Sequence, residues 1–573
     1  MYIQRNKSKG KNGKIYRSVL LCRKYRDNGK IKTKVLANLS HLPEHIVLSI
    51  ENGLKHDMGT LVYEKDIVAQ EAVDIGLFVL LWHLMNKLRI SEVLDKVVPE
   101  PSPFLKAVII GKIITRGSKL GIFNWLKRNE FISSKLGIDI NRTKVDHIYS
   151  ALGQASYQQS KLERKWYLYN KAKTNEVYLY DITSTYFEGM QNELAAFGYS
   201  RDKKKGKMQM LIALLTDSTG FPLKIIAFKG NINDYKTVKA QINSIKKEFN
   251  ADDVIFVGDR GMKIRYNLRN MDEAEREGVN YITGLTHSEI ESLLKEDVIQ
   301  LSLFSKDLAE VEHEGTRFIL SVNPDLQERE LRYLQTTRAL VEEELAEIKA
   351  SWEVRRNKNM ENKQRIEAGD KNKKLVTEFD QKKLDAYKLR VEKVLSKRRM
   401  KKYYEIVEIS NDNFIIDFKA QAYQQAKHLA GKYVVCTNLE KERMDKTEVR
   451  QQYKNLQKVE HAFRDFKSDN IQIRPVYHRN EAQTRGHVLM SMFSYAIIKE
   501  MENKIYPFLK QWNHENNTKL SFSDIMEELR NVKLITLKVG KNVKSVQFTA
   551  LNPIQEQILN LFGVKKQMLD SLL

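Results

Sequence analysis

The sequence predicts an α/β protein with a mixed β-sheet at its core, and three observations support this fold class. Strand-like and helix-like patterns alternate between residues 176 and 286. An apolar strand pattern returns at 431–438, GKYVVCTN, after a long charged stretch. Hydrophobic residues make up 42% of the chain, which suffices for globular packing, and 573 residues exceed what one hydrophobic core holds. We therefore expect several domains around the sheet.

The chain begins with patterns typical of a small basic β module and then becomes helical. IYRSVLLCRKYR and KIKTKVLANLS alternate as strands do, and the turn signal DNGK (27–30) joins them. We assign this module to residues 1–60. The apolar spacing over 61–170 is mostly helical, with Lys and Arg between the helices. These helices could bind DNA or act as a spacer, and the pattern favours neither.

Residues 171–290 are predicted to form the first part of the sheet domain. A hairpin and further strands alternate with helices there, as in mixed α/β sheets. In chain order, the expected elements are a strand in EVYLYDITSTYFEG, a hairpin in KMQMLIALLTDSTGFPLKIIAFKGN with its turn at DSTG, a helix in NDYKTVKAQINSIKKEF, a buried strand in DDVIFVGDRGM, a helix in KIRYNLRNMDEAEREG and a strand in NYITGLT.

Residues 291–430 interrupt this rhythm and are predicted to be a large insertion. Within them, 351–402 holds 18 Lys+Arg against 8 Asp+Glu, with helix formers throughout. This composition predicts a long charged helix or helical hairpin, which either contacts DNA or forms a solvated surface. The strand GKYVVCTN opens the second part of the core, residues 431–510. Residues 511–573 form a C-terminal region.

The net charge is the strongest global signal in the composition. Lys+Arg number 97 against 73 Asp+Glu, a formal charge of +24, which favours a polyanionic partner such as nucleic acid. No stretch approaches the roughly 20 apolar residues of a membrane-spanning helix, so no membrane partner is expected. The charged start lacks the apolar region of a signal peptide, so we expect a cytoplasmic protein. Cys22 and Cys436 form no CxxC motif, so neither a disulfide framework nor a zinc site is expected.

Two aspartates stand at positions where a carboxylate needs a partner. Asp181 interrupts an otherwise apolar and aromatic strand, and an unpaired carboxylate is costly to bury. Asp259 ends the strand VIFVGD, and open α/β sheets build their sites at that end of a strand. The competing interpretation of Asp259 is local, because its side chain could cap the amides of Gly261 and Met262.

A third carboxylate, Glu460, lies in YKNLQKVEHAFRDFK (453–467), a stretch that predicts one amphipathic helix. The apolar stripe of this helix consists of Leu456, Val459, Phe463 and Phe466. The opposite face, expected to be solvated, consists of Lys454, Lys458, His461 and Asp465. Glu460 lies at the border of the stripe, in line with Tyr453 and Lys467 two turns away on either side. Arg464 lies one turn from Glu460, so a simple ion pair on the helix surface is the competing interpretation.

Three carboxylates on two strands and a helix, in a basic protein, predict a divalent-metal site. Mutual repulsion would penalise them unless cations lie between them, and Mg²⁺ prefers oxygen ligands. Two Mg²⁺ ions, with Mn²⁺ as a substitute, would activate a water or a 3′-hydroxyl and stabilise the leaving oxygen at phosphorus. We therefore assign Asp181, Asp259 and Glu460 as catalytic residues and metal ligands. No P-loop, GxSxG or HExxH motif offers a competing chemistry.

Together these motifs resemble the DDE transposases of bacterial insertion sequences, in the branch named after insertion sequence four and its sixteen-thirty-four lineage. The matching pieces are YDITSTYFEG around Asp181, GYSRDKK (198–204), FPLKIIAFKGNIND, VGDRGM around Asp259 and YKNLQKVEHAFRDFKSDNIQIRPVYH around Glu460. They cover roughly 176–290 and 430–500, with weaker similarity before them. The resemblance implies an α/β fold with an RNase H-like mixed sheet core, in which a large insertion precedes the catalytic glutamate helix.

The resemblance also implies a function, the cut-and-paste movement of a transposable element. It implies metal-dependent cleavage of double-stranded DNA at the element's terminal inverted repeats and strand transfer into target DNA. Region 61–170 is then a candidate to bind the element ends, with the spacer role still open. The resemblance also implies a homodimer assembled on DNA, and we expect the protein at the bacterial nucleoid. Two alternatives remain open: an RNase H-like nuclease that cuts without joining, and a non-catalytic DNA-binding protein derived from a transposase.

The branch carries a signature, Tyr-x2-Arg-x3-Glu-x6-Lys, which Tyr453, Glu460 and Lys467 fit. The expected Arg falls at Leu456, where this chain departs, and Arg464 is the candidate to replace it. In the family, the Tyr and Lys beside the glutamate contact DNA phosphates near the cleaved bond. The expected DNA contacts of this chain are Tyr453, Arg464, Lys467, Arg260 and Arg474.

Overall fold

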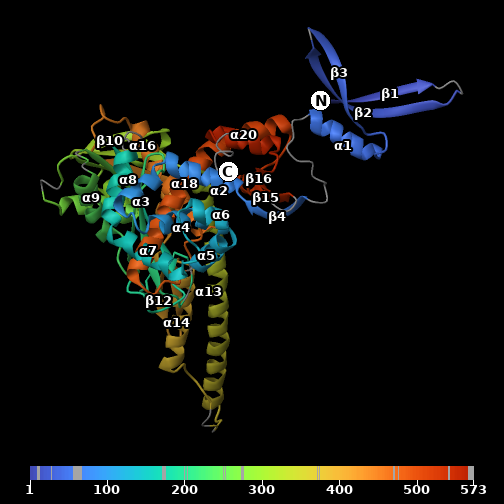
Figure 1. Ribbon diagram of the computed structural model, residues 1–573. Coiled ribbons are helices and arrows are strands. Elements are labelled where there is room, and N and C mark those ends of the chain that lie inside the picture. The colour runs from blue at the N-terminus through green and yellow to red at the C-terminus, as the bar shows by residue number, and fades with distance from the viewer. Residues whose placement is uncertain are drawn as a thin grey trace. The chain divides into compact units, whose positions relative to one another are not determined.

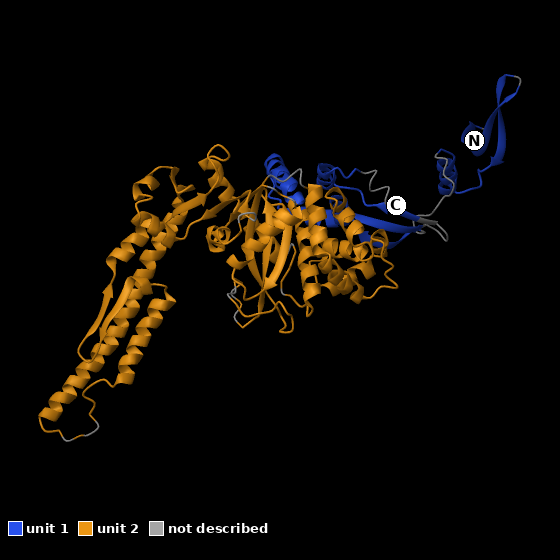
Figure 2. Cartoon of the chain, turned by 90° about the vertical axis from the view of Figure 1, so that its left-hand side faces the viewer, with its two compact units in different colours: residues 1–84, 500–573 blue, residues 85–499 orange. Residues whose placement is uncertain are grey.

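A computed structural model of the protein describes most of residues 1–573 (Figure 1). The residues outside the description are 10–12, 28, 56–66, 171–175, 199, 200, 203, 205, 250, 252, 273–275, 371, 373, 374, 469, 470, 475, 540–542 and 566–573. The described chain forms two compact units, residues 1–84 with 500–573, and residues 85–499 (Figure 2). Among the described residues, no helix combines the length and apolar character needed to cross a membrane.

An eight-stranded mixed sheet lies at the centre of the larger unit. Its strands are β5 (Val177–Tyr186), β6 (Gln209–Asp217), β7 (Pro222–Lys229), β8 (Val254–Gly258), β9 (Val279–Gly284), β10 (Ala309–His313), β11 (Thr316–Val322) and β14 (Lys432–Thr437). They lie in the order β10-β11-β14-β9-β8-β5-β6-β7. Side chains of β5, β6 and β8 are buried almost throughout, as expected of apolar strands covered on both faces.

The pairing of five neighbouring strands defines the fold. β6 pairs antiparallel with both β5 and β7, whereas β8 runs parallel to both β5 and β9. A three-stranded meander joined to two parallel strands is the RNase H-like arrangement, so the predicted fold class is confirmed. β14, β11 and β10 extend this sheet beyond β9, each antiparallel to its neighbour.

Helices cover the sheet and include those expected between its strands. α9 (Tyr235–Phe249) joins β7 to β8, and α10 (Ile264–Arg269) follows β8. The sequence predicted a longer helix here, over 263–278; α10 ends at Arg269, and 273–275 lie outside the described residues.

The region before the sheet contains mostly short helices, as its apolar spacing predicted. They are α2 (Gly76–Lys87), α3 (Ile90–Val97), α4 (Ser102–Thr115), α5 (Lys119–Arg128), α6 (Glu130–Lys135), α7 (Val145–Tyr157) and α8 (Gln159–Asn170). Trp166 packs α8 against the sheet. Its ring stacks on Phe221 at 5.3 Å and meets the edge of Phe493 at 5.4 Å. Its Nε1 donates to the carbonyl of Pro222 at the start of β7 (2.9 Å).

The predicted helical hairpin is present and belongs to a larger excursion from the sheet. The excursion comprises α13 (Pro324–Glu367), α14 (Gln381–Lys397), β12 (Tyr404–Ile409), β13 (Phe414–Phe418) and α15 (Ala420–Leu429). α13 and α14 lie side by side in Figure 1. β10 and β11 fall in the range 291–430 that was expected as an insertion, yet they are strands of the main sheet. The chain therefore leaves the sheet only between Val322 and Lys432.

This excursion has a hydrophobic core of its own, built around Trp352. The Trp352 ring lies 6.1 Å from the ring of Phe379 and 5.7 Å from that of Phe414, between centroids. Its Nε1 donates to the carbonyl of Ser410 (3.1 Å). Burying an aromatic side chain of this size is among the largest single contributions to a small core.

The smaller unit contains two three-stranded sheets. β1 (Tyr2–Lys9), β2 (Ile15–Asp27) and β3 (Lys30–Asn38) form the expected β module with α1 (Glu44–Lys55). In the predicted turn DNGK, Asn28 lies outside the described residues, as does the predicted boundary at residues 60 and 61. β15 (Lys533–Val539) pairs with β16 (Val543–Phe548) and with β4 (Ile67–Asp74), a strand that the helical interpretation of 61–170 did not anticipate. The last part of α18 (Glu481–Asn516), from residue 500 on, also belongs to this unit, as do α19 (Phe522–Arg530) and α20 (Pro553–Phe562).

The stretch 453–467 is not one helix, as the sequence predicted, but parts of two. α16 (Lys446–Lys454) and α17 (Leu456–Lys467) meet at Asn455. The backbone there stays right-handed, but the amide of Lys458 donates to the Asn455 carbonyl three residues back (2.8 Å), which tightens the turn. The Asn455 side chain bonds those of Gln451 and Gln452, which competes with regular helix bonding.

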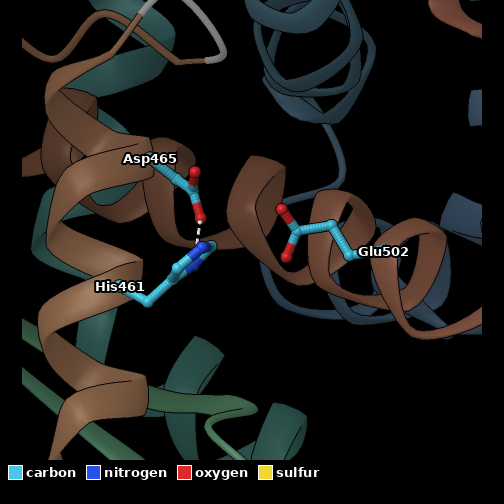
Figure 3. Close-up of side chains that lie close together, drawn as sticks. All are labelled: His461, Asp465 and Glu502. Atoms are coloured by element: carbon cyan, nitrogen blue, oxygen red, sulfur yellow. Dashed lines mark ion pairs between the residues drawn. The ribbon is translucent and has the colours of Figure 1, made fainter. Parts of the chain in front are cut away.

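Asp465 was expected on the solvated face of this stretch, and the structure corrects that expectation. Asp465 is only 7% exposed. Its carboxylate lies 3.1 Å from Nδ1 of His461, one turn earlier on α17, and the two side chains point toward one another (Figure 3). The reason is pairing: a half-buried histidine at i−4 gives the buried carboxylate a partner along the helix.

The sheet register predicts that the excursion can be removed without breaking the core. Val322 pairs with Lys432, and the amide of Asn323 donates to the carbonyl of Gly431 (2.8 Å). Deleting residues 324–430 would leave Asn-Gly between these strands, the dipeptide that best forms a two-residue hairpin turn. We expect this variant to unfold cooperatively near the melting temperature of the intact core, measured by circular dichroism. Loss of cooperative unfolding would show that the excursion is part of the core.

Candidate active site

The two predicted aspartates lie next to each other because β5 and β8 are parallel. The register pairs Tyr180 with Gly258, so the residues that follow, Asp181 and Asp259, are neighbours at the edge where β8 ends. Paired residues of parallel strands project from the same face of the sheet. The strand pairing alone therefore places two carboxylates together.

Tyr453 at the end of α16 reaches the second aspartate. Its hydroxyl donates to Oδ1 of Asp259 (3.2 Å), and the same oxygen accepts from the amide of Arg260 (2.8 Å). Gly284, the last residue of β9, makes this contact possible. A Cβ at that position would lie 2.2 Å from the Tyr453 hydroxyl.

Lys467 at the end of α17 is anchored on the other side of the aspartates. Its Nζ donates to Oγ1 of Thr183 on β5 (2.7 Å) and to Oδ1 of Asp202 (2.9 Å). Arg474 donates to the same Asp202 oxygen (2.7 Å). Asp202 is almost fully buried, with a side chain 4% exposed, so it needs both cations.

Helices α16 and α17 therefore bridge the strand edge, and Glu460 lies between the two anchor points. Phe466 secures the apolar side of α17, with its ring 5.3 Å from that of Tyr495. α17 packs on β5, the strand that carries Asp181. The exposed side chain of Glu460 projects into a cleft of about 620 Å³. The cleft is lined by Asp181, Ile182, Thr183, Arg201, Asp259, Arg260, Asn323, Leu326, Tyr433, Tyr453, Lys454, Leu456, Gln457, Glu460, Phe463, Arg464 and Lys467.

Charge repulsion is visible in the ionisation of the first aspartate. The pKa of Asp181 is raised to about 7, chiefly by burial and additionally by the carboxylates of Asp259 and Glu460. The amide of Ile182 and the guanidinium of Arg201 oppose this rise. Burial also raises the pKa of Tyr453, and Asp259 adds to that rise, so the hydroxyl stays protonated as a donor. The three carboxylates thus lie close enough to affect one another.

The structure brings seven of the eight predicted site residues into one cleft. Asp181, Asp259, Glu460, Tyr453, Arg464, Lys467 and Arg260 line it. Arg474 does not line this cleft; it contacts Asp202 and lines a second cavity. The roles assigned to these residues remain predictions.

The structure bears on two competing interpretations from the sequence, a surface ion pair for Glu460 and a local cap for Asp259. Among the described residues, no ion pair joins Glu460 to Arg464, and both side chains are exposed at the cleft. Asp259 does cap a short helical turn, at Arg260–Met262, but its side chain accepts from the Arg260 amide rather than from Gly261 or Met262. A cap and a ligand position are compatible, because the second carboxylate oxygen is not used in that hydrogen bond.

Sequence reasoning missed two charged residues beside the carboxylates. Arg201 donates to the carbonyl of Ile182 and to the carboxylate of Asp234, and it lines the cleft. Asp202 holds Lys467 and Arg474, as described above. Both lie in GYSRDKK, which carried part of the family resemblance, so the motif pointed to them without assigning a role. In that motif, 199, 200 and 203 lie outside the described residues.

Comparison with known proteins identifies the class that this fold and cleft define. Residues 173–376 match the family model "Transposase DDE domain", a match that ends before Glu460. The chain is thus a transposase with a DDE domain. Residues 3–56 match the model "IS1634 family transposase, N-terminal domain", and the two matches together support a DDE insertion-sequence transposase of the IS1634 family.

Two further comparisons add less. No curated protein matches the chain. A solved structure, the cryo-EM synaptic complex of piggyBac transposase with hairpin DNA, is 8% identical, with 91% of this chain and 79% of that chain covered. The TM-score of this pair is 0.31.

The close approach at Gly284 yields a test of the Tyr453 contact. Gly284→Ala should displace Tyr453 from Asp259 and lower the free energy of unfolding by about 1–3 kcal/mol, as overpacking does. Gly261→Ala is the control, because a Cβ there meets nothing within 4 Å. Thermal unfolding measures both. The loss should shrink when Gly284→Ala is combined with Tyr453→Ala, since the clash is then absent; additive losses would contradict this account.

Lys467 and Arg464 should differ in their effect on stability. Lys467→Ala leaves the buried Asp202 with one cation, which should cost about 1–3 kcal/mol of unfolding free energy. Arg464→Ala removes an exposed side chain for which the described residues provide no hydrogen bond, so its melting temperature should barely change. Sequence alone predicted no stability effect for either. Equal melting temperatures for both variants would show that Asp202 does not depend on Lys467.

Proposed function

We propose that this transposase catalyses divalent-metal-dependent DNA cleavage at the ends of its insertion sequence and strand transfer into target DNA, by a cut-and-paste route. One observation carries the proposal: Asp181, Asp259 and Glu460 line a single cleft together with basic side chains. Carboxylates alone would suit many metal sites. Carboxylates flanked by Arg260, Arg464 and other cations suit a phosphodiester substrate, because each phosphate carries a negative charge.

The donor set fits a divalent cation. Three carboxylates supply hard oxygen ligands, and the pKa of Asp181 is raised by burial first and by the neighbouring carboxylates second, both of which a bound cation would offset. Asp181, Asp259 and Glu460 would hold the ions, Mg²⁺ by preference and Mn²⁺ as a substitute. When bound, such ions activate an attacking hydroxyl and stabilise a departing oxygen at phosphorus.

The chain's own side chains would position the substrate. Tyr453 holds the orientation of Asp259 through its hydroxyl, and Arg201 fixes the backbone of Ile182 next to Asp181. Arg464 and Lys454 are exposed at the cleft, and neither side chain makes a hydrogen bond or ion pair within the described part of the chain, so they can take up non-bridging phosphate oxygens. Lys467 is occupied by Asp202 and serves first to fix the end of α17.

The remaining parts of the proposal concern the partners. The substrate is double-stranded DNA, the terminal inverted repeats first and the target DNA second. A homodimer on DNA in the bacterial cytoplasm, at the nucleoid, is the proposed acting form. The domains assigned from the sequence are proposed as functional divisions, except that β10 and β11 belong to the sheet domain and not to the insertion. A nuclease that cuts without joining is the second candidate, since the same cleft would support cleavage alone.

The decisive experiment uses DNA from the ends of the element that carries this gene. The protein, Mg²⁺ and a duplex with the inverted repeat and its flank should yield cleaved ends and, with target DNA, joined products. Cleaved ends without joined products would favour the nuclease. Neither product, from a folded protein that binds the duplex, would overturn the proposal.

Each of the three carboxylates should be needed for cleavage but not for binding. Asp181→Asn, Asp259→Asn and Glu460→Gln should each lower the cleavage rate by at least about 10³-fold, since each removes a metal ligand. Glu442→Gln, an exposed acid outside the cleft, is the control. Gel-shift binding to the same duplex should stay within about threefold. Retained cleavage in any of the three variants would remove that residue from the catalytic set.

DNA binding should weaken steeply with salt, because the excess of 97 Lys+Arg over 73 Asp+Glu acts through phosphates. The variant lacking 324–430 should show a smaller slope of log affinity against log salt concentration, since the deletion removes 24 Lys+Arg and 19 Asp+Glu, including the basic stretch 351–402 with 18 against 8. Fluorescence anisotropy at several salt concentrations measures the slope. An unchanged slope would assign the basic hairpin to a solvated surface.

A further inference from the structure

A second cavity lies next to the catalytic cleft and has a different chemistry. It encloses about 430 Å³. Its lining includes Ser118, Lys119, Arg474, His478, Arg479 and His487. Five of these six side chains are basic. Lys119, His478 and His487 have no part in the catalytic site proposed above.

Three of the basic side chains are more than nine-tenths buried. The exposed fractions are 8% for Lys119, 9% for His478 and 3% for His487. Nζ of Lys119 lies 2.6 Å from Nδ1 of His487, so within the described residues the hydrogen-bond partner of this amine is another base. The second ring nitrogen of His487, Nε2, lies 3.5 Å from the carbonyl of Ile473. The His478 ring packs against the rings of Tyr149 and His487, at 5.7 and 5.2 Å between centroids, and no hydrogen bond to it is found among the described residues.

Negative charge is scarce around this cluster. Asp146 is the acid among the lining residues, and its side chain is exposed. Arg474 already bonds Asp202. A fourth base, Lys112 of α4, is 2% exposed and lies close enough to act electrostatically on Lys119 and both histidines.

Burial and the proximity of other bases lower the pKa values of the four buried basic side chains. Burial lowers the pKa of Lys112 to about 7 and that of His478 to about 2, and the neighbouring lysines add to the effect on His478. Burial and the other bases also hold the pKa values of Lys119 and His487 well below their usual ranges. Buried bases without a counter-ion cost folding free energy, and an anion in the cavity would remove that cost.

The start of α5 adds donors to the same cavity. Ser118 caps the helix, with its Oγ accepting from the amide of Gly121 (3.1 Å), and Gly117, Ser118 and Lys119 line the cavity. The amides of the first helical turn have no partner within the helix, and the helix dipole is positive at that end. A helix start and a cluster of buried bases thus converge on one space.

The cavity is coupled to the catalytic cleft through Asp202. One oxygen of Asp202 accepts from Lys467, which lines the cleft, and from Arg474, which lines the cavity. A single carboxylate oxygen therefore bonds one lining residue of each space. This shared contact makes a DNA strand that enters the cleft the candidate to supply a phosphate to the cavity.

We propose that the cavity lined by Ser118, Lys119, His478 and His487 is a phosphate-binding site, which holds a second phosphate group of the DNA strand that occupies the catalytic cleft. The choice of DNA as the source rests on the proposed function. Holding a second phosphate fixes the direction in which the strand crosses the site, and the binding free energy is then available for alignment. The competing structural account is that the bases form a buried polar network that joins α5 to the segment around His478 and binds no anion.

Inorganic phosphate tests the site without DNA. At constant ionic strength and pH 7, phosphate in place of chloride should raise the melting temperature of the full-length protein. Lys119→Met, which keeps the apolar stem, should abolish that rise, and so should His478→Phe, which keeps the ring packing. Lys127→Met is the matched control, an exposed lysine on the same helix, and should keep the full response. No rise in the wild type, or an equal rise in Lys119→Met, would overturn the site.

A DNA experiment identifies which phosphate is bound. Single backbone phosphates near the cleaved bond are replaced by neutral methylphosphonates, one position at a time. One position should weaken binding to the wild type about tenfold or more, as loss of a charge-assisted contact does, and should have no effect on Lys119→Met. Duplexes with a 5′-phosphate end and with a 5′-hydroxyl end are compared in the same assay. If binding depends only on this end group, the bound phosphate is terminal and not internal. If the wild type and Lys119→Met lose the same affinity at every methylphosphonate position, the cavity does not bind a DNA phosphate.

The two proposals fail separately. A wild type that responds to phosphate but cleaves no element end would refute the proposed function and leave the anion site standing. A wild type that cleaves, with Lys119→Met indistinguishable in both assays, would refute the anion site alone.

Discussion

The burial of Asp181 next to a second carboxylate, Asp259, is the constraint on which the rest of this structure depends. Parallel pairing of β5 with β8 fixes the two residues as neighbours. Such a pair is costly unless its surroundings compensate. Here the compensation comes from hydrogen bonds at the strand edge: the amides of Ile182 and Arg260, the Tyr453 hydroxyl and the nearby charge of Arg201.

The helices that bring Glu460 must add a third negative charge to this edge without being repelled from it. Their attachment uses a neutral hydroxyl that donates to Asp259, a separate carboxylate and apolar packing. Tyr453 fits over Gly284 at one end, Lys467 is bound to Thr183 and Asp202 at the other, and the apolar side of α17 packs inward. The break at Asn455 allows α16 and α17 to take different directions over one strand edge. The site is thus held open by interactions that are themselves independent of any bound cation.

Much of this could be predicted from the sequence, and the failures have physical causes. The strands around Asp181 and Asp259 were predictable, because buried strands form apolar, β-branched runs with a clear period. Glu460 needed the family resemblance, since its helix pattern also fits a surface ion pair. The break at Asn455 was not predictable, because helix propensity continues through it and only local side-chain bonds decide. The Asp202 bridge and the buried lysines depend on contacts between distant segments; Lys112 and Lys119 alone look like solvated residues.

The position of the excursion between β11 and β14 has a consequence for the order of folding. Asp181 and Asp259 belong to strands that can pair soon after synthesis, whereas β14 and Glu460 emerge only after the whole excursion. β14 must then pair with β9 and β11 across a long loop, whose closure is entropically unfavourable. The excursion's own core shortens that loop in effect, since it brings Asn323 and Gly431 together. A nascent chain would therefore be unable to bring Glu460 to Asp181 and Asp259 until translation had passed α17.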